Sequence, residues 1–138
     1  FPRGRGRFIA THPQLPAGMP DQDYPFLLST GRVLEHYHTG TMTRKSDGLN
    51  RLVPACQAEI HPEDARRLEI VPGQQVRVAS RRGEITVTAL VTNRVAPGMV
   101  FIPFHFAEAA ANALTNAACD AAARIPEFKV CAVRIEPE

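Results

Sequence analysis

The fold is decided by the stretch QVRVASRRGEITVTALV, residues 75–91, in which apolar and polar residues alternate. The alternation runs over residues 75–80 and again over residues 84–91, with Arg-Arg-Gly between them. A period of two is typical of strands that bury one face, and a short glycine-containing segment between two such strands is typical of a hairpin turn. The stretch therefore predicts a β-hairpin with one buried face.

Four further short apolar stretches are predicted strands: residues 26–30, 58–60, 99–102 and 130–135. Residues 61–68 predict a short helix, because a proline stands in the first turn and acidic residues precede basic ones. The alanine-rich residues 107–114 favour a second helix. Residues 32–50 have neither a helical nor a strand period, which indicates a loop. Many short strands and two small helices predict a mainly β fold, a small β-barrel with helices at its ends.

The length of 138 residues fits one domain, and an apolar content of 44% supplies a core without disulfides. Cys56, Cys119 and Cys131 are sparsely spaced and suit neither a disulfide scaffold nor a zinc knuckle, which favours a reducing compartment. No apolar run approaches the roughly 20 residues that span a bilayer. The chain also starts at Phe1 without Met. We expect a cytoplasmic protein without membrane insertion, and a fragment of a longer one.

The net charge of +2 comes from 16 Lys and Arg against 14 Asp and Glu, a balance that argues against a nucleic-acid partner. Fourteen of the basic residues are Arg. Arg suits bidentate recognition of phosphate or carboxylate, although codon usage in a GC-rich genome explains the same excess. Residues 1–25 hold five prolines and the Arg-Gly arm, and we expect them to form an extended lead-in to one barrel domain over residues 26–138. Binding of RNA by the arm is the alternative.

A polar segment follows the first predicted strand and combines glycines, hydroxyls and positive charge. Such a mix suits an anionic, ring-bearing ligand, while a solvated loop is the alternative. In extended backbone, His36 and His38 would share a face, yet no third ligand stands at a suitable spacing, so we predict no metal site. The candidate ligand-binding residues of this segment are Thr30, Gly31, Arg32, His36, His38, Thr39 and Thr41.

Two further clusters carry candidate binding residues. Phe104 and His105 follow a predicted strand and lead to Asn112, so that aromatic faces and an amide could meet a heterocycle. Phe128 and Lys129 precede the last predicted strand, where a positive charge stands beside an aromatic ring. The alternatives are ordinary core packing for the phenylalanines and a solvated Lys. The sequence contains no P-loop, dinucleotide fingerprint, zinc-protease motif or nucleophile elbow, and we predict no catalytic residues.

Four segments together carry a family resemblance: PFLLSTGRVLEHYHTGTMTR, EIHPEDARRL, SRRGEITVTALVTNRVAPGMVFIPFHFAEAAANALTN and IPEFKVCAVRIE. They span residues 25–136 and cover most of that range. The chain resembles the C-terminal domain of the molybdopterin oxidoreductases, most closely the α (catalytic) subunit of formate dehydrogenase. The resemblance implies a double-psi β-barrel that binds molybdopterin guanine dinucleotide. Two copies of this cofactor, bis-MGD, hold molybdenum or tungsten jointly with domains that this sequence lacks.

The resemblance also implies which residues contact the cofactor. These are Arg32, His36, His38, Thr39 and Thr41 from the first segment, Phe104 and Asn112 from the second, and Phe128 and Lys129 from the third. The metal ligand and the iron-sulfur cysteines of the family lie in other domains, and the three cysteines here do not match them. We therefore expect a cofactor-binding domain that works with the rest of an α subunit, and with electron-transfer subunits, to interconvert formate and CO2. The alternative from another class is an independent double-psi barrel that acts as an interaction module without cofactor.

Overall fold

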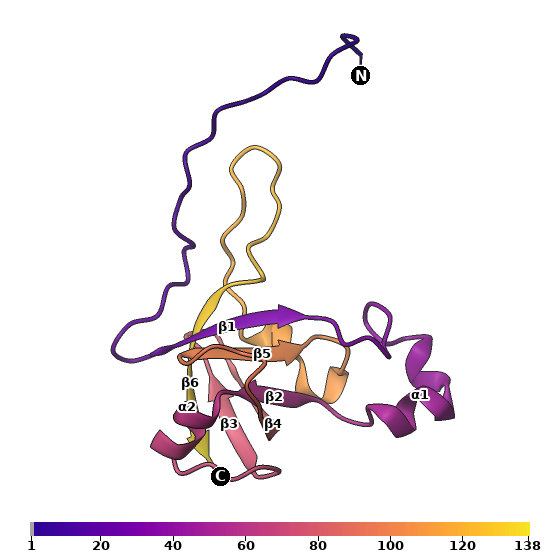
Figure 1. The fold of residues 1–138 in the computed structure, drawn as a ribbon, viewed down its shortest axis with the longest axis vertical. Coiled ribbons are helices and arrows are strands. Elements are labelled where there is room, and N and C mark those ends of the chain that lie inside the picture. Colours follow the sequence, from indigo (N-terminus) through magenta and orange to yellow (C-terminus); the bar gives the residue numbers. More distant parts are fainter. Residues whose placement is uncertain (1) are drawn as a thin grey trace.

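A closed barrel of six strands forms the body of the molecule in the computed structural model, which describes residues 2–138 (Figure 1). Phe1, the first residue of the expected lead-in, lies outside the described residues. The predicted hairpin and the four other predicted strands are all confirmed, as is the helix expected at residues 61–68. The strands are β1 (Phe26–Gly31), β2 (Gln57–Ile60), β3 (Gln75–Ala79), β4 (Glu84–Val91), β5 (Met99–Pro103) and β6 (Cys131–Pro137), and the α-helices are α1 (Asp47–Leu52) and α2 (Pro62–Arg67).

Around the ring the strands follow the order β1-β5-β2-β4-β3-β6, and β6 closes against β1. Two of the six pairings are parallel, β1 with β5 and β2 with β4. The other four are antiparallel. Exchanging β1 with β4, β2 with β5 and β3 with β6 leaves every pairing and its direction unchanged. The first three strands therefore repeat their pairing pattern in the last three.

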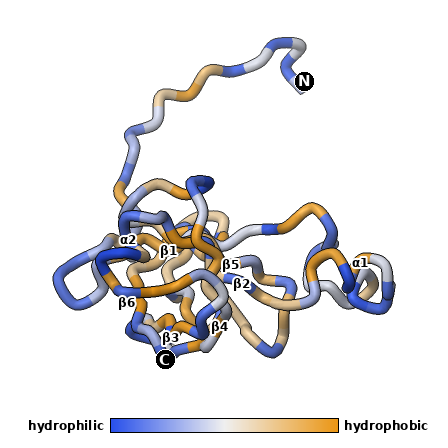
Figure 2. The backbone as a smooth tube through the Cα atoms, turned by 60° about the horizontal axis from the view of Figure 1, so that its bottom comes forward, coloured by the Kyte–Doolittle hydropathy of each residue, from blue (hydrophilic) through white to orange (hydrophobic). Residues whose placement is uncertain are grey.

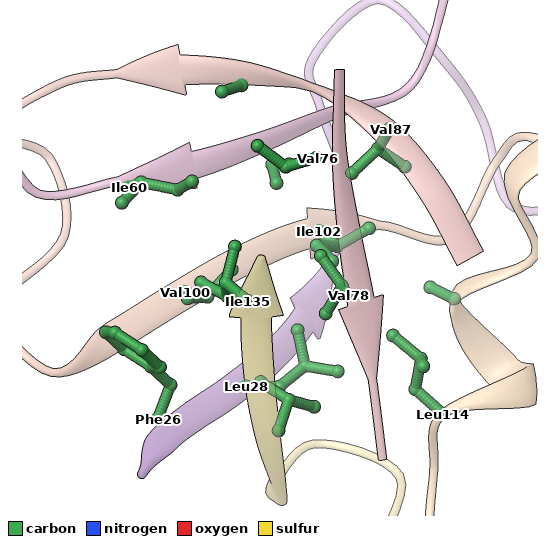
Figure 3. Packing of buried hydrophobic residues seen from close by; sticks show 14 of the residues in the cluster. Phe26, Leu28, Ile60, Val76, Val78, Val87, Val100, Ile102, Leu114 and Ile135 are labelled. Carbon is green, nitrogen blue, oxygen red and sulfur yellow. The ribbon is translucent and has the colours of Figure 1, made fainter. Parts of the chain in front are cut away.

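The barrel interior is filled by alternate residues of every strand. Leu28, Val76, Val78 and Val100 are fully buried, and Figure 3 shows their side chains pointing into the space that the strands enclose. Burying a side chain of this size contributes about 1.5–3 kcal/mol. Closure of the barrel leaves no strand edge unpaired. The apolar residues at alternate positions of the strands therefore face one enclosed core.

Helix α2 fastens the turn between β4 and β5 to the rest of the barrel. His61 caps the helix, its side chain accepting a hydrogen bond from Glu63 N. The buried carboxylate of Asp64 accepts a hydrogen bond of 2.6 Å from Gly98 N in that turn, and it pairs with Arg67 at 2.8 Å. The Arg67 guanidinium lies 5.2 Å from the ring centroid of Phe26 at the start of β1. One short helix thus contacts the start of β1 and the turn that leads into β5, at the same end of the parallel pair.

Two sequence-based expectations about helices are wrong. Residues 107–114 form two 3₁₀ turns, Ala107–Ala109 and Ala111–Ala113, instead of one helix. Ala110 between them has an extended backbone (φ −68°, ψ 92°), so the helix propensity of alanine is overridden by the course of the chain. Residues 32–50 include the 3₁₀ turn Thr43–Lys45 and the start of α1. A six-residue helix has fewer than two turns, too few to show a period in the sequence.

The N-terminal segment and the loop before β6 project from the barrel (Figure 1). Residues 2–15 are exposed, and Figure 2 shows hydrophobic and hydrophilic stretches along this segment. The segment is fastened at its base, where Ala17 N donates a 2.9 Å hydrogen bond to Glu127 and Asp21 pairs with Arg81. None of the helices between residues 2 and 138 has the length and apolar character that crossing a membrane requires.

Replacing Asp64 by Ala is expected to lower the free energy of unfolding by about 1–3 kcal/mol, because Gly98 N–H loses its acceptor. Asp64→Asn keeps an acceptor at the same place and should lose less. Glu63→Ala, which changes an exposed carboxylate in the same helical turn, is the matched control and should cost less than about 1 kcal/mol. Urea unfolding curves measure all three, and equal losses for Asp64→Ala and Glu63→Ala would contradict this account.

Candidate functional site

A cavity of about 720 Å³ lies between the segment that follows β1, the segment that follows β5 and the loop that precedes β6. The parallel pairing of β1 with β5 brings the first two together. Gly31 and Pro103 are register partners, and Phe104 N donates a 3.2 Å hydrogen bond to Gly31 O. Both strands therefore end at the same place and deliver their next residues to one site. The cavity is lined by Arg32, His38, Thr39, Phe104, Asn112, Thr115, Asn116, Pro126, Phe128 and Lys129.

Seven of the twelve residues predicted to bind a ligand line this cavity. They come from all three predicted clusters, which are up to 97 residues apart in the sequence. The seven are Arg32, His38, Thr39, Phe104, Asn112, Phe128 and Lys129. The other five, Thr30, Gly31, His36, Thr41 and His105, are not among the lining residues.

Two cations face aromatic rings in the cavity. The Arg32 guanidinium carbon lies 5.8 Å from the centroid of the Phe104 ring, and its Nη2 is 3.4 Å from His38 Nε2. Lys129 Nζ lies 5.9 Å from the Phe128 ring centroid and donates a 3.4 Å hydrogen bond to Thr30 O. None of these cations is paired with a carboxylate among the ion pairs of residues 2–138. Their charge is available to an anion.

Thr30 and Gly31 support the cavity from behind. The buried Thr30 hydroxyl donates a 2.8 Å hydrogen bond to Phe128 O and so ties the third cluster to the end of β1. At Gly31, a Cβ atom would lie 2.5 Å from the Phe101 ring, so any larger residue would have to displace that ring. Both residues shape the site without lining it.

His36 and His38 do not share a face, contrary to the expectation for extended backbone. His38 has φ +50°, in the left-handed region, and this bend turns the two side chains apart. His36 is buried, with Nε2 2.9 Å from Val53 O and Nδ1 3.2 Å from the Thr43 hydroxyl. Its partners are therefore in the protein, whereas His38 is exposed and lines the cavity.

His105 is also buried, with 1% of its surface exposed. Its Nε2 accepts a 3.0 Å hydrogen bond from Val33 N, and its Nδ1 hydrogen-bonds to His38 O. Burial lowers the pKa of His105 below its ordinary value of 6.5, more than the hydrogen bond to His38 raises it, and the neighbouring His36 and Arg32 lower it further. The ring therefore joins the end of β5 to two points of the segment after β1.

The remaining predicted residue, Thr41, lies beside the cavity wall. Its hydroxyl is 2.9 Å from that of Thr39, which does line the cavity. Further along the same segment, Arg44 forms a bidentate ion pair with Glu108, with both N···O distances 2.7 Å. This pairing lowers the pKa of the Glu108 carboxyl. It holds the segment after β1 against the 3₁₀ turn that follows β5.

Three lining residues were missed by the sequence-based prediction: Thr115, Asn116 and Pro126. Asn116 is buried at the base of the projecting loop, where its Nδ2 donates to Val130 O at 3.0 Å and its Oδ1 accepts from Ala118 N at 2.8 Å. An antiparallel bridge between Cys119 and Pro126 folds this loop back on itself. The fold-back pairs Pro126 with Cys119, and no local pattern in the sequence predicts this pairing.

A second cavity, of about 760 Å³, lies on the outside of the barrel and shares Arg32 with the first. Phe101, Met99 and Leu90 supply much of its apolar lining. Its charged pair, Arg94 and Glu59, is already satisfied by a 3.0 Å contact. Apart from Arg32, it contains none of the predicted ligand-binding residues.

The cysteines take no part in the first cavity. Burial raises the pKa of the Cys56 thiol to about 12 and also raises that of Cys131. Cys119 is exposed on the projecting loop, and all three are free. Within residues 2–138, no three His, Cys, Asp or Glu side chains gather as a metal ion would require. The groups present in the cavity can bind an anion and stack on a flat ring.

Comparison with known proteins gives one family match. A family model described as "Molydopterin dinucleotide binding domain" matches residues 26–132. Acetylene hydratase from Pelobacter acetylenicus has a similar structure, with a TM-score of 0.55 over 60% of this chain and 11% of that one. At 21% identity, the likeness supports the fold alone.

Similar sequences occur in longer proteins. The F420-dependent formate dehydrogenase subunit alpha of Methanocaldococcus jannaschii is 51% identical over 96% of this chain, and the F420-dependent formate dehydrogenase 1 subunit alpha of Methanococcus maripaludis is 49% identical over 98% of it. A protein named nitrate reductase from Symbiobacterium thermophilum is 45% identical over 98% of the chain. The match spans 20%, 20% and 18% of these relatives, so the chain corresponds to about one-fifth of their length.

Thr30→Val is expected to lower the free energy of unfolding by about 1 kcal/mol, because it removes the hydrogen bond to Phe128 O at nearly constant volume. Amide hydrogen exchange should become faster around residues 126–130 and stay unchanged in β3 and β4. Thr88→Val is the matched control, since within residues 2–138 the Thr88 hydroxyl accepts a hydrogen bond only from the exposed Gln75 side chain. Unchanged exchange around residues 126–130 would show that Thr30 does not hold this wall.

Proposed function

The chain belongs to the molybdopterin dinucleotide binding domain family, and from this premise we propose that its 720 Å³ cavity holds part of a molybdopterin guanine dinucleotide. The observation that carries the proposal is the convergence of Arg32, Lys129, Phe104 and Phe128 on one cavity from three separate parts of the chain. The proposed cofactor carries molybdenum, or tungsten in its place, and is held jointly with other domains.

The residues of the cavity fit this group by their chemistry. A pyrophosphate is anionic and calls for guanidinium and ammonium donors, which Arg32 and Lys129 provide. A pterin is flat with polar edges, and the Phe104 and Phe128 rings and the Asn112 amide match it. Arg32 lies near the Phe104 ring and Lys129 near the Phe128 ring, so a bound ligand meets a positive charge and a flat aromatic surface at the same place.

When bound, the cofactor supplies two-electron redox chemistry at its metal. The part of this chain is to bind and orient it. Arg32 and Lys129 fix the phosphates, the rings exclude water from the pterin, and Thr39 and Asn112 donate hydrogen bonds at its edges. The chain thus positions a reacting group without contributing a catalytic residue of its own.

We further propose that the chain is the C-terminal domain of a formate dehydrogenase α subunit that interconverts formate and CO2. The identities of 51% and 49% to formate dehydrogenase α subunits over almost the whole chain support this. Since the chain corresponds to about one-fifth of their length, the rest of the subunit would supply the metal ligand and the contacts to electron-transfer subunits. The free cysteines support a reducing compartment, the cytoplasm.

The pairing pattern supports a finer description of the fold as a double-psi β-barrel. In this proposal, β1, β2 and β3 form one half and β4, β5 and β6 the other, interlocked through the parallel pairs β1–β5 and β2–β4. Residues 26–138 make up this domain, and residues 1–25 are its extended lead-in. The exposure of residues 2–15 supports the latter assignment.

The binding proposal predicts saturable, if weak, binding of the isolated pterin dinucleotide by this chain. Arg32→Ala and Lys129→Ala should each weaken it about tenfold to a hundredfold, since charge-assisted hydrogen bonds contribute about 1.5–3 kcal/mol. Chemical-shift titration by NMR measures dissociation constants into the millimolar range. Arg51→Ala and Lys45→Ala, which remove exposed cations outside the cavity, are the matched controls and should leave affinity unchanged.

If the wild-type chain shows no shifts at any attainable concentration, or if the control variants weaken binding as much as Arg32→Ala, the cavity is not the cofactor site. Shifts confined to the outer cavity around Phe101 would move the site there. Complete absence of binding would favour the alternative of an interaction module without cofactor.

The substrate is tested in the complete subunit that carries this sequence. We expect F420-dependent formate oxidation and no nitrate reduction, because the two relatives named for F420-dependent formate dehydrogenase are more similar than the one named for nitrate. Parallel assays with formate and with nitrate measure this. Nitrate reduction without formate oxidation would leave the cofactor proposal intact and overturn the substrate.

A further inference from the structure

His105 lies behind the cavity and reaches two residues of the segment after β1. Its Nε2 accepts a hydrogen bond of 3.0 Å from Val33 N, in the peptide that joins Val33 to Arg32. On the opposite side of the ring, Nδ1 hydrogen-bonds to His38 O. The ring thus fixes the peptide plane next to Arg32 and the backbone of His38, and both of these side chains line the cavity.

The main chain at His105 adds a third contact with the same segment. A Cβ atom on Gly40 would lie 2.9 Å from His105 O, and Gly40 has φ +74°. The segment therefore closes over His105 at a position that only glycine accepts. Between these contacts, His38 keeps its left-handed backbone at φ +50°, a conformation that costs free energy unless its surroundings hold it.

We propose that His105 is a positioning residue, which holds Arg32 and His38 in the geometry that binds the cofactor and does so only while its ring is neutral. The inference rests on the proposed function and goes beyond it, because His105 itself does not touch the cofactor. In this proposal the buried His105 ring does not line the cavity, but it determines the position of two residues that do.

The two hydrogen bonds require one tautomer. The carbonyl of His38 can only accept, so Nδ1 carries the hydrogen, and Val33 N–H can only donate, so Nε2 offers its lone pair. Protonation places a second N–H at Nε2, directly against the Val33 N–H. The two donors repel, the segment after β1 separates from the ring, and Arg32 loses its fixed position.

Several charged or titratable groups surround the ring. His36 has its ring centroid 5.8 Å away, and His38 and Arg32 belong to the segment that His105 holds. On the other side of Gly40, the Arg44 side chain pairs with Glu108, so its charge is balanced. The unbalanced neighbours are basic, and together with burial they keep the neutral ring favoured: the pKa of His105 lies below its ordinary value of 6.5.

The sign of the pH dependence follows from this. The free energy by which His105 stabilises the segment after β1 is fully present above pH 6.5, the ordinary histidine pKa. It is lost as the pH falls from 6.5 through the lower pKa of His105 in the folded protein. A pyrophosphate diester stays ionised over the same range.

The first test needs no cofactor. Histidine ring signals and amide exchange are followed by NMR from pH 7.5 to pH 5 in the 138-residue chain. We expect the protection factor at Val33, which compares its exchange rate with the intrinsic rate at each pH, to fall about tenfold with the same midpoint as the His105 ring, while amides in β3 and β4 keep their protection factors. A Val33 protection factor that does not follow the His105 titration would overturn the proposal.

Two variants separate the role of the ring from simple packing. Gln in place of His105 keeps an acceptor towards Val33 N and does not titrate, so protection at Val33 should persist and become independent of pH. Phe keeps the volume and removes both hydrogen bonds, so protection should be lost at every pH. His12→Asn in the exposed lead-in is the matched control and should behave as the wild type. If His105→Phe does not fold, the wild type and His105→Gln decide the question.

The second test measures the affinity of the isolated pterin dinucleotide at pH 7.5 and 5.5. We expect the wild type to bind about threefold to tenfold more weakly at pH 5.5, from the loss of one hydrogen bond that fixes Arg32, and His105→Gln to show no such loss. Binding by the wild type that is equal at both pH values overturns this inference and leaves the proposed function standing. If the chain binds no cofactor at either pH while exchange at Val33 still follows the His105 titration, the proposed function is overturned instead.

Discussion

The parallel pairing of β1 with β5 is the constraint on which the rest of the structure depends. It sets Gly31 opposite Pro103, so that both strands end side by side and the residues that follow, Arg32 and Phe104, emerge at one place. In the ring, β6 lies on the other side of β1 and β2 on the other side of β5. The direct pairing of β1 with β5 brings together two segments that lie more than 70 residues apart in the sequence. The strand topology therefore determines where the site lies, and the side chains determine what it can bind.

The polar interior behind the cavity is made of groups that satisfy one another. His36, His105 and Thr30 are all buried, and each makes a hydrogen bond to a backbone group of another segment. Buried polar groups with complete partners specify one arrangement, because any alternative leaves a donor or acceptor without a partner. The cavity walls can therefore be loops and still keep a defined shape. The exposed Arg32 and Lys129 have no carboxylate partner within residues 2–138, so their charges can interact with an anion.

The sequence predicted the strands well because their signals are local. Alternation over residues 75–91 and the flanking turn residues identify a strand without any knowledge of its partner. The missed features depend on contacts that are distant along the chain. Ala110 is extended although alanine favours helix. The His38 carbonyl is hydrogen-bonded to the His105 ring, 67 residues further along the chain. Pro126 lies in a loop that folds back on itself through the bridge between Cys119 and Pro126. The residue types of the site were thus recognisable, while the division into lining and supporting residues was not.

The repeated pairing pattern has a consequence for how this chain folds. The halves β1–β3 and β4–β6 are joined only through the short turn after β3, yet each strand of one half pairs with strands of the other, and neither half can enclose a core by itself. Contacts within one half contribute little stabilising free energy, because no strand pairs with another strand of its own half. Such non-local topologies fold slowly and in one cooperative step, with the cost of chain closure met before the core forms. While the chain is being synthesised, the first three strands must therefore wait, with their apolar faces open, until the last strand has arrived.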